Sequence, residues 1–114
     1  MAIQLSSELL DGAVLGLLSE QDYYGYALTK KVQESFPVSE STMYPVLRRL
    51  KKNAALETYD EAYEGRNRRY YRITMTGETM LTKLQEEWEL FRENVDTILK
   101  LKESGEEDER NDIL

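Results

Sequence analysis

The sequence contains no cysteine and no histidine. Their absence excludes disulfide bonds, thiolate nucleophiles, zinc sites built from these residues and acid–base catalysis by an imidazole. No run of about 18 apolar residues is present, and the opening segment MAIQLSSELL lacks the basic region of a signal peptide. We therefore expect a cytoplasmic protein with no membrane partner, no metal and no cofactor, in which any enzyme chemistry would have to use carboxylates, lysine or tyrosine.

The charge is unevenly distributed along the chain. The net charge of −7 over 114 residues argues by itself against binding to nucleic acid. Residues 1–29, however, carry four acids and no lysine or arginine, residues 30–72 carry ten bases and six acids, and residues 73–114 carry five bases and twelve acids. Because a binding face depends on local charge, the basic middle block is the part that could contact nucleic acid.

The chain is long enough for one domain. Two helices are expected in its first third. Apolar residues recur at helical spacing from Leu5 to Leu18, with Ser6 or Ser7 as the N-cap. The second helix covers about residues 24–35 and stops before Pro37. Two glycines lie inside the first helix, where each costs roughly 1 kcal/mol relative to alanine. They indicate either a weak helix or the close approach of another element.

A third helix is expected from Ser39, a good N-cap, to Lys52, and its two sides differ in chemistry. Its apolar stripe consists of Met43, Val46, Leu47 and Leu50. Its other side carries Ser41, Tyr44, Arg48 and Lys52. Pro45 removes one backbone hydrogen bond and crowds the carbonyl four residues earlier, so we expect a bend there.

Two strands are expected after the third helix. Residues 56–63, LETYDEAY, alternate imperfectly, Glu64-Gly65 is typical of a turn, and RRYYRIT from Arg68 is rich in aromatic and β-branched residues. The tip and the returning strand carry four arginines, namely Arg66, Arg68, Arg69 and Arg72. A solvated hairpin charged for solubility is the alternative interpretation, but so tight a cluster is hard to explain that way in a chain of net negative charge.

A long last helix is expected from Thr74 or Thr76. Its apolar residues step alternately by three and four, which is typical of a helix that pairs with another one. They are Leu81, Leu84, Trp88, Phe91, Val95 and Ile98. Such a seam can be buried on the helix's own domain or on a second copy, and we favour a homodimer. The acidic segment after it is expected to be disordered.

These elements predict a mainly α fold, namely a winged helix-turn-helix with a two-stranded β wing and a long C-terminal dimerisation helix. The expected parts are the DNA-binding domain (1–73), the dimerisation helix (74–103) and the tail (104–114). The third helix would enter the major groove of double-stranded DNA while the arginines hold the flanking phosphates. The predicted DNA contacts are Ser41, Thr42, Tyr44, Arg48, Lys51, Lys52, Arg66, Arg68 and Arg69.

The sequence resembles the PadR family of transcriptional regulators from about residue 5 to 102. The matching segments are YYGYAL (23–28), STMYPVLRRL (41–50) and GRNRRYYRITMTG (65–77). This resemblance implies a homodimeric repressor that binds a pseudo-palindromic operator, usually at genes for detoxification or transport. Where the family commonly has a glycine after the third helix, this chain reads Asn53-Ala54-Ala55. Asn53 can take the left-handed conformation of that glycine, so the helix is expected to end near it and the fold to be kept.

The short C-terminal part resembles the multidrug-sensing members of that family, which carry a tryptophan at the position of Trp88. The resemblance implies that two such side chains hold a planar aromatic effector between them, although Trp88 could equally be a packing residue. The expected second wall of the slot is Glu8, Asp11, Gly12 and Leu15. Its acids favour a cationic ligand, whereas Arg92 stands where the drug-binding members have an acid, so the ligand's charge stays open.

Two other classes of function are compatible with the sequence. The winged domain could be an adaptor that binds protein through the acidic last helix, without DNA binding or ligand sensing. An enzyme would rely on carboxylates such as Glu86, Glu87 and Glu89, but such a run beside a hydrophobic seam is ordinarily a solvated helix face. We therefore predict no catalytic site.

Overall fold

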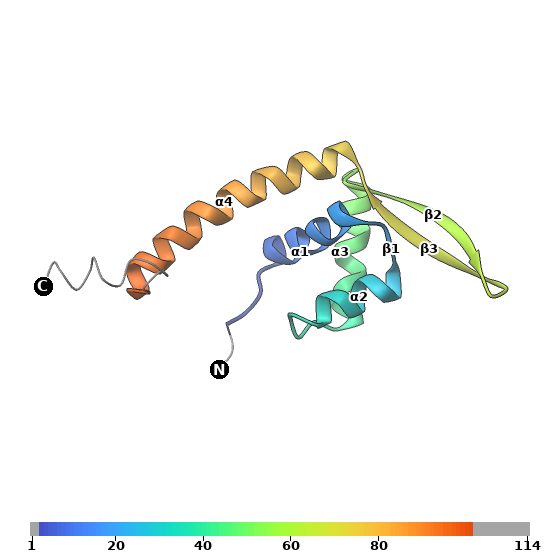
Figure 1. The fold of residues 1–114 in the computed structure, drawn as a ribbon, viewed down its shortest axis with the longest axis horizontal. Helices are drawn as coiled ribbons and strands as arrows, with labels where there is room; N and C mark the ends of the chain where they lie inside the picture. The colour runs from blue at the N-terminus through green and yellow to red at the C-terminus, as the bar shows by residue number, and fades with distance from the viewer. Residues whose placement is uncertain (1–2, 102–114) are drawn as a thin grey trace, which may run out of the picture. The chain divides into compact units, whose positions relative to one another are not determined.

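The computed structural model describes residues 3–101 and divides the chain into two units, Met1–Leu84 and Gln85–Leu114. The elements are α1 (Ser7–Glu20), β1 (Tyr23–Tyr24), α2 (Gly25–Gln33), α3 (Glu40–Lys52), β2 (Leu56–Tyr63), β3 (Arg66–Ile73) and α4 (Met75–Leu99). The predicted fold class, mainly helical with a small antiparallel sheet and a C-terminal helix, is confirmed (Figure 1). The predicted tail, 104–114, lies outside the described residues.

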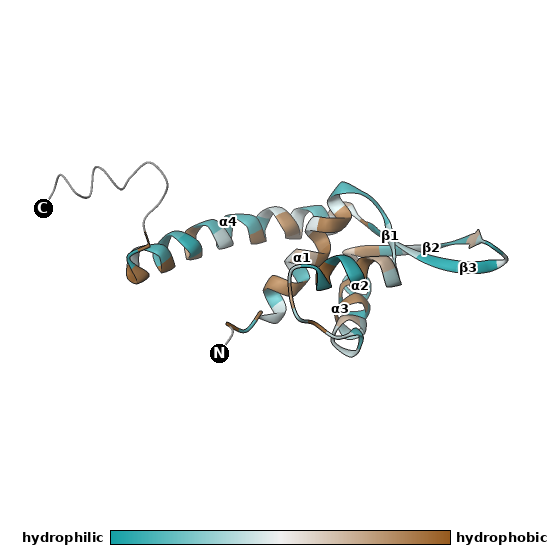
Figure 2. Ribbon diagram, turned by 60° about the horizontal axis from the view of Figure 1, so that its bottom comes forward, coloured by the Kyte–Doolittle hydropathy of each residue, from teal (hydrophilic) through white to brown (hydrophobic). Residues whose placement is uncertain are grey.

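The first unit has one hydrophobic core, formed by the helices and the base of the sheet. Its buried members are Leu10, Val14, Leu15, Leu18, Leu28, Val32, Met43, Val46, Leu47, Leu50, Ala55 and Leu56. All four residues of the predicted apolar stripe of α3 are among them, because helical periodicity brings them to one side. The hairpin of β2 and β3 becomes hydrophilic toward its turn, which extends beyond the helices (Figure 2).

The sheet has three antiparallel strands in the order β1-β3-β2, one more than predicted. Tyr23 and Tyr24 of β1 lie opposite Tyr71 and Tyr70 of β3. Two residues are too few to show an alternating pattern, so this strand could not be predicted from the sequence. The hairpin turn contains Glu64 and Gly65 at φ of 48° and 78°, as a two-residue turn between twisted strands requires. β3 begins at Arg66, two residues before the predicted start.

The third helix ends in a Schellman motif. The backbone N–H of Ala55 donates to the Leu50 carbonyl at 2.9 Å, and that of Ala54 donates to the Lys51 carbonyl at 3.0 Å. Ala54 is the left-handed residue, at φ 62°, whereas Asn53 is the C-cap at φ −86°. The helix therefore ends near Asn53, as predicted, but the left-handed residue is Ala54 and not Asn53. At the other end Ser39 is the N-cap, as predicted, and α3 is one continuous helix through Pro45.

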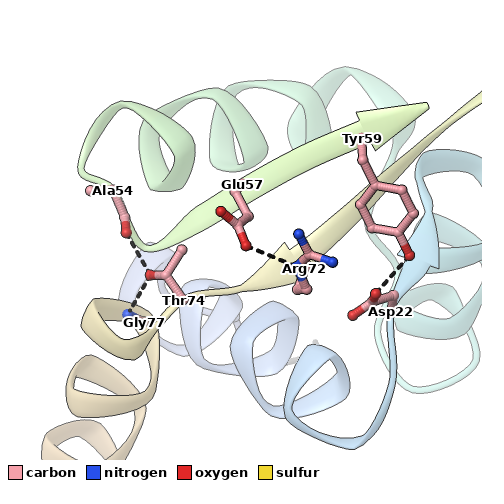
Figure 3. Close-up of polar contacts among 7 residues, drawn as sticks. All are labelled: Asp22, Ala54, Glu57, Tyr59, Arg72, Thr74 and Gly77. Atoms are coloured by element: carbon pink, nitrogen blue, oxygen red, sulfur yellow. Dashed lines mark hydrogen bonds and ion pairs between the residues drawn. The ribbon is translucent and has the colours of Figure 1, made fainter.

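The start of α4 is attached to this turn by Thr74. The backbone N–H of Thr74 donates to the Ala55 carbonyl at 3.0 Å, and its hydroxyl donates to the Ala54 carbonyl at 2.6 Å. The same hydroxyl accepts from the Gly77 N–H at 3.0 Å, which makes Thr74 the cap of α4 (Figure 3). A Cβ on Gly77 would lie 2.7 Å from Ile73 Cγ1 and would also collide with the Ala55 carbonyl oxygen. Glycine is therefore required at this crossing.

A second set of polar contacts joins the outer strands. The Tyr59 hydroxyl donates to Asp22 Oδ2 at 2.6 Å and so ties β2 to the segment before β1 (Figure 3). The hydrogen bond to the Asp22 carboxylate raises the pKa of Tyr59 to about 12, because ionisation would remove the proton that the carboxylate accepts. Beside it, Arg72 Nε donates to Glu57 Oε1 at 2.8 Å.

The described part of the second unit is the end of α4 and two further residues. It exposes large apolar side chains at Trp88, Leu90, Phe91, Ile98 and Leu99. The rings of Trp88 and Phe91 lie 6.1 Å apart. Between residues 3 and 101, no helix combines the length and the apolar composition needed to cross a membrane.

The left-handed Ala54 leads to a stability prediction. Replacing Ala54 by glycine should raise the free energy of unfolding by about 0.5–1 kcal/mol, because the left-handed conformation costs an L-residue more than glycine's extra chain entropy. Urea denaturation measures the change. Asn53→Gly is the matched control and should lower stability by about 0.5 kcal/mol, since Asn53 has negative φ. A lower stability for Ala54→Gly would contradict the backbone geometry.

The Tyr59–Asp22 hydrogen bond leads to a pH prediction. A pKa raised from 10 to about 12 means that the folded state holds this proton more tightly than the unfolded chain. The stabilisation is therefore complete below pH 10 and is lost as the pH rises to about 12. The difference in unfolding free energy between wild type and Tyr59→Phe should shrink over that interval in urea denaturation. A difference that stays constant through it would refute the assignment.

Candidate nucleic-acid interface

The outward side of α3 presents the predicted groove-contacting residues. The side chains of Ser41, Thr42, Tyr44, Arg48, Lys51 and Lys52 are all exposed. Tyr44 stands out because this large aromatic residue is 57% exposed, whereas the preceding residue, Met43, is buried. At the start of the helix the Ser39 hydroxyl lies 2.9 Å from that of Ser41 and 3.1 Å from that of Thr42. Hydroxyls therefore gather at the positive end of the helix dipole.

The basic residues of this surface differ in whether a carboxylate compensates them. Within residues 3–101, no ion pair involves Arg48, Lys51, Lys52, Arg66 or Arg68, whereas Arg49, Arg69, Arg72 and Arg92 are all paired. Five of the six cations predicted to contact DNA are thus available to external anions. The pair of Arg69 Nε with Asp60 Oδ1, at 3.2 Å, has both side chains about half exposed. Such surface pairs contribute little, so a phosphate can displace Asp60 at small cost.

The hairpin presents its arginines on two faces. Successive residues of a strand point to opposite faces, so Arg69 shares a face with Tyr71, and Arg68 shares the other face with Tyr70. Burial raises the pKa of Tyr71, the nearby Tyr44 adds to this rise, and the positive charge of Arg69 opposes it. Tyr44 of α3 and Arg69 of β3 therefore both lie near Tyr71 in the first unit.

The other face of the sheet carries a group of rings, the tyrosine cluster, which consists of Tyr24, Tyr26, Tyr59, Tyr63 and Tyr70. Tyr59 stacks on Tyr70 with ring centres 5.4 Å apart, and Tyr24 meets Tyr70 edge-on at 5.7 Å. The guanidinium carbon of Arg68 lies 3.6 Å from the ring centre of Tyr63 and 4.1 Å from that of Tyr24. The contact of Tyr24 and Tyr63 with Arg68 could not be predicted from the sequence, because the alignment of Tyr24 with the hairpin depends on β1.

Most of the α1 residues predicted to face a ligand make contacts within the first unit and do not line an open slot. Only Glu8 has an exposed side chain. Asp11 forms an ion pair with Arg49 of α3, and a Cβ on Gly12 would collide with the side chain of Leu84, so close approach explains this glycine. Leu15 is 1% exposed and belongs to the core, so it does not line an open wall. Apolar residues lie around most of α1, and periodicity therefore could not tell its buried side from its open one.

The predicted dimer seam divides at the boundary between the units. Leu81 packs against the core and Leu84 packs on Gly12, so both already have contacts within their own unit. Trp88, Phe91, Val95 and Ile98 belong to the second unit, where Ile98 is 78% exposed. A shallow groove of about 350 Å³ lies there, lined by Phe91, Asn94, Val95, Ile98 and Leu99.

Comparison with known proteins identifies the family of the chain. Residues 14–83, more than half of the chain, match the transcriptional regulator PadR-like family. A protein of Lysinibacillus sphaericus, called Uncharacterized protein X, is 35% identical over 96 residues, which cover 80% of this chain and 88% of that protein.

Two solved structures illustrate the similarity. That of smu.1704 from Streptococcus mutans UA159 has a TM-score of 0.82 at 34% identity and covers 89% of this chain and 95% of that one. The PadR-like transcriptional regulator BC4206 from Bacillus cereus strain ATCC 14579 has a TM-score of 0.75 at 32% identity, with coverages of 82% and 94%. Members of the matched family regulate transcription through DNA and are not enzymes. The chain described here belongs to the PadR-like family of transcriptional regulators.

Proposed function

We propose that the protein is a homodimeric repressor that inserts two copies of α3 into successive major grooves of a pseudo-palindromic operator, about 34–36 Å apart. The observation that carries this proposal is a set of five basic side chains on the exposed side of α3 and on β3. None of the five has a carboxylate partner among residues 3–101. Bound DNA would supply the missing anions and release counterions. Genes for detoxification or transport are the expected targets.

The residues of the surface have different roles in this proposal. Ser41, Thr42, Tyr44 and Arg48 lie on the outward side of α3, where they would meet bases and nearby phosphates, with Lys51 and Lys52 at the rim of the groove. Arg66, Arg68 and Arg69 would hold the flanking backbone. Base contacts then determine sequence preference, and the backbone contacts fix the position of the protein on the duplex.

The second unit supports pairing of two copies. Trp88, Phe91 and Ile98 expose between 41% and 78% of their side chains on one helix, which is unfavourable in water unless another surface covers them. In the proposed dimer the two Trp88 rings face each other and accept a planar aromatic effector between them. Arg92 donates to Glu89 at 2.8 Å and to Asp96 at 3.2 Å, so its charge is compensated within the helix. Effector binding would then change the spacing of the two α3 helices and release DNA.

The first test of the proposal is a gel shift with a duplex from the promoter of the protein's own operon. Arg68→Ala should weaken binding to every duplex and lower the slope of log Kd against log salt by about one unit for each protomer, because one phosphate contact is lost. Lys83→Ala, which removes one charge from α4 outside the proposed surface, should leave the slope unchanged. Wild-type protein that binds no promoter duplex would instead favour the adaptor function.

The effector slot can be tested through the single tryptophan of the chain. A planar aromatic dye should quench Trp88 fluorescence in the wild-type dimer. Ile98→Glu places a charge in the proposed interface and should give a monomer in which this quenching is lost although Trp88 remains. Thr97→Glu, one residue away and also exposed, is the matched control and should stay dimeric and quenched. Equal quenching in a monomeric Ile98→Glu would argue against a shared slot.

A further inference from the structure

We propose that Tyr63 and Tyr24 are positioning residues that hold the Arg68 guanidinium ready for a DNA phosphate, an inference that rests on the proposed function. Arg68 lies on the central strand of the sheet, and the two rings come from the strands on either side of it. Their centres are 3.6 Å and 4.1 Å from the guanidinium carbon, well inside the range of a cation–π contact.

The strand register explains why these two rings reach Arg68. Tyr63 lies opposite Arg66, and Tyr24 lies opposite Tyr70, so each ring is a diagonal neighbour of Arg68 on the same face. Diagonal neighbours are close enough for aromatic and long side chains to touch. The residue directly opposite Arg68 is Glu61, yet within residues 3–101 the two form no ion pair. The two rings therefore orient the guanidinium, and no carboxylate among residues 3–101 forms an ion pair with it.

This arrangement suits a phosphate contact better than an ion pair would. A guanidinium stacks through its flat faces and donates hydrogen bonds from its edge, so ring contacts leave its donors available. A long flexible side chain loses rotamer freedom when it binds, and one that is already restrained loses less. Arg68 is half-buried, whereas Arg66, near the turn, is exposed. The two arginines should therefore differ in how much their surroundings contribute to DNA affinity.

The rings also connect Arg68 to the helix-turn-helix. Tyr24 directly precedes α2 as its N-cap residue and stacks on Tyr26 inside that helix at 6.5 Å. It also contacts Tyr70 edge-on. The position of Arg68 is thus defined relative to the body of the first unit as well as to its own hairpin. A phosphate bound there would be at a fixed distance from α3, which is what a backbone contact must supply.

A double-mutant cycle on promoter binding tests the inference. Tyr63 is exposed near the turn, so Tyr63→Leu should fold normally, which urea denaturation verifies. It should raise Kd about three- to tenfold in the wild-type background. In the Arg68→Ala background the same change should leave Kd unaltered, because no guanidinium remains to be positioned. Tyr63→Phe keeps the ring and should bind like wild type.

A second substitution makes the result independent of Tyr63. Arg68→Lys keeps the charge but loses the flat group that stacks on the rings, so it should lose affinity while the salt slope stays unchanged. The inference is overturned if Tyr63→Leu weakens binding equally with and without Arg68, if it has no effect, or if Arg68→Lys binds as tightly as wild type. Wild-type protein that binds no duplex would overturn the proposed function itself, whereas these three outcomes leave it intact.

Discussion

The rest of the first unit depends on the turn at Ala54 and Ala55, where the end of α3 meets the start of α4. The carbonyls of Ala54 and Ala55, whose N–H groups form the Schellman motif, accept both hydrogen bonds that Thr74 donates, and the Thr74 hydroxyl in turn caps α4. Gly77 lets the two backbones approach where any Cβ would collide. The turn thereby fixes where β2 leaves α3 and where β3 enters α4. A hairpin attached at both ends to one point can project its arginines at a defined distance from α3.

Charge is arranged around this framework so that an acidic protein can have a basic surface. The chain carries −7 overall, but the exposed side of α3 and the wing include five cations that form no ion pair among residues 3–101. Among residues 3–101, the arginines that are not predicted to contact DNA are paired, as Arg49 is with Asp11 and Arg72 is with Glu57. Long-range repulsion between the acidic residues and DNA is screened over about 10 Å at ordinary salt. Contacts at the surface therefore decide binding.

Elements with a strong local pattern could be predicted from the sequence. Features that depend on contacts between residues far apart in the sequence could not. The apolar stripe of α3, the serine caps and the turn at Glu64 each follow from a few neighbouring residues. The two-residue strand β1 has no pattern of its own, and without it the contact of Tyr24 with Arg68 could not be foreseen. The burial of Leu15 was missed because α1 is apolar on most sides. The chemistry of Asn53 allows the left-handed conformation, but the hydrogen bonds of the Schellman motif require it at Ala54.

The first helix contacts both α3 and the part of α4 that belongs to the first unit. Gly12 lies against Leu84 in the first-unit part of α4, and the adjacent residue Asp11 pairs with Arg49 of α3. Neighbouring residues on a helix differ by about 100° in direction, so α1 can contact both helices at one level of its axis. A shift of α4 at Leu84 would therefore press on α1 directly beside its ion pair with α3. In the proposed repressor this contact would give α4 a short path to the helix that would read DNA, because packed interiors transmit displacement with little compression.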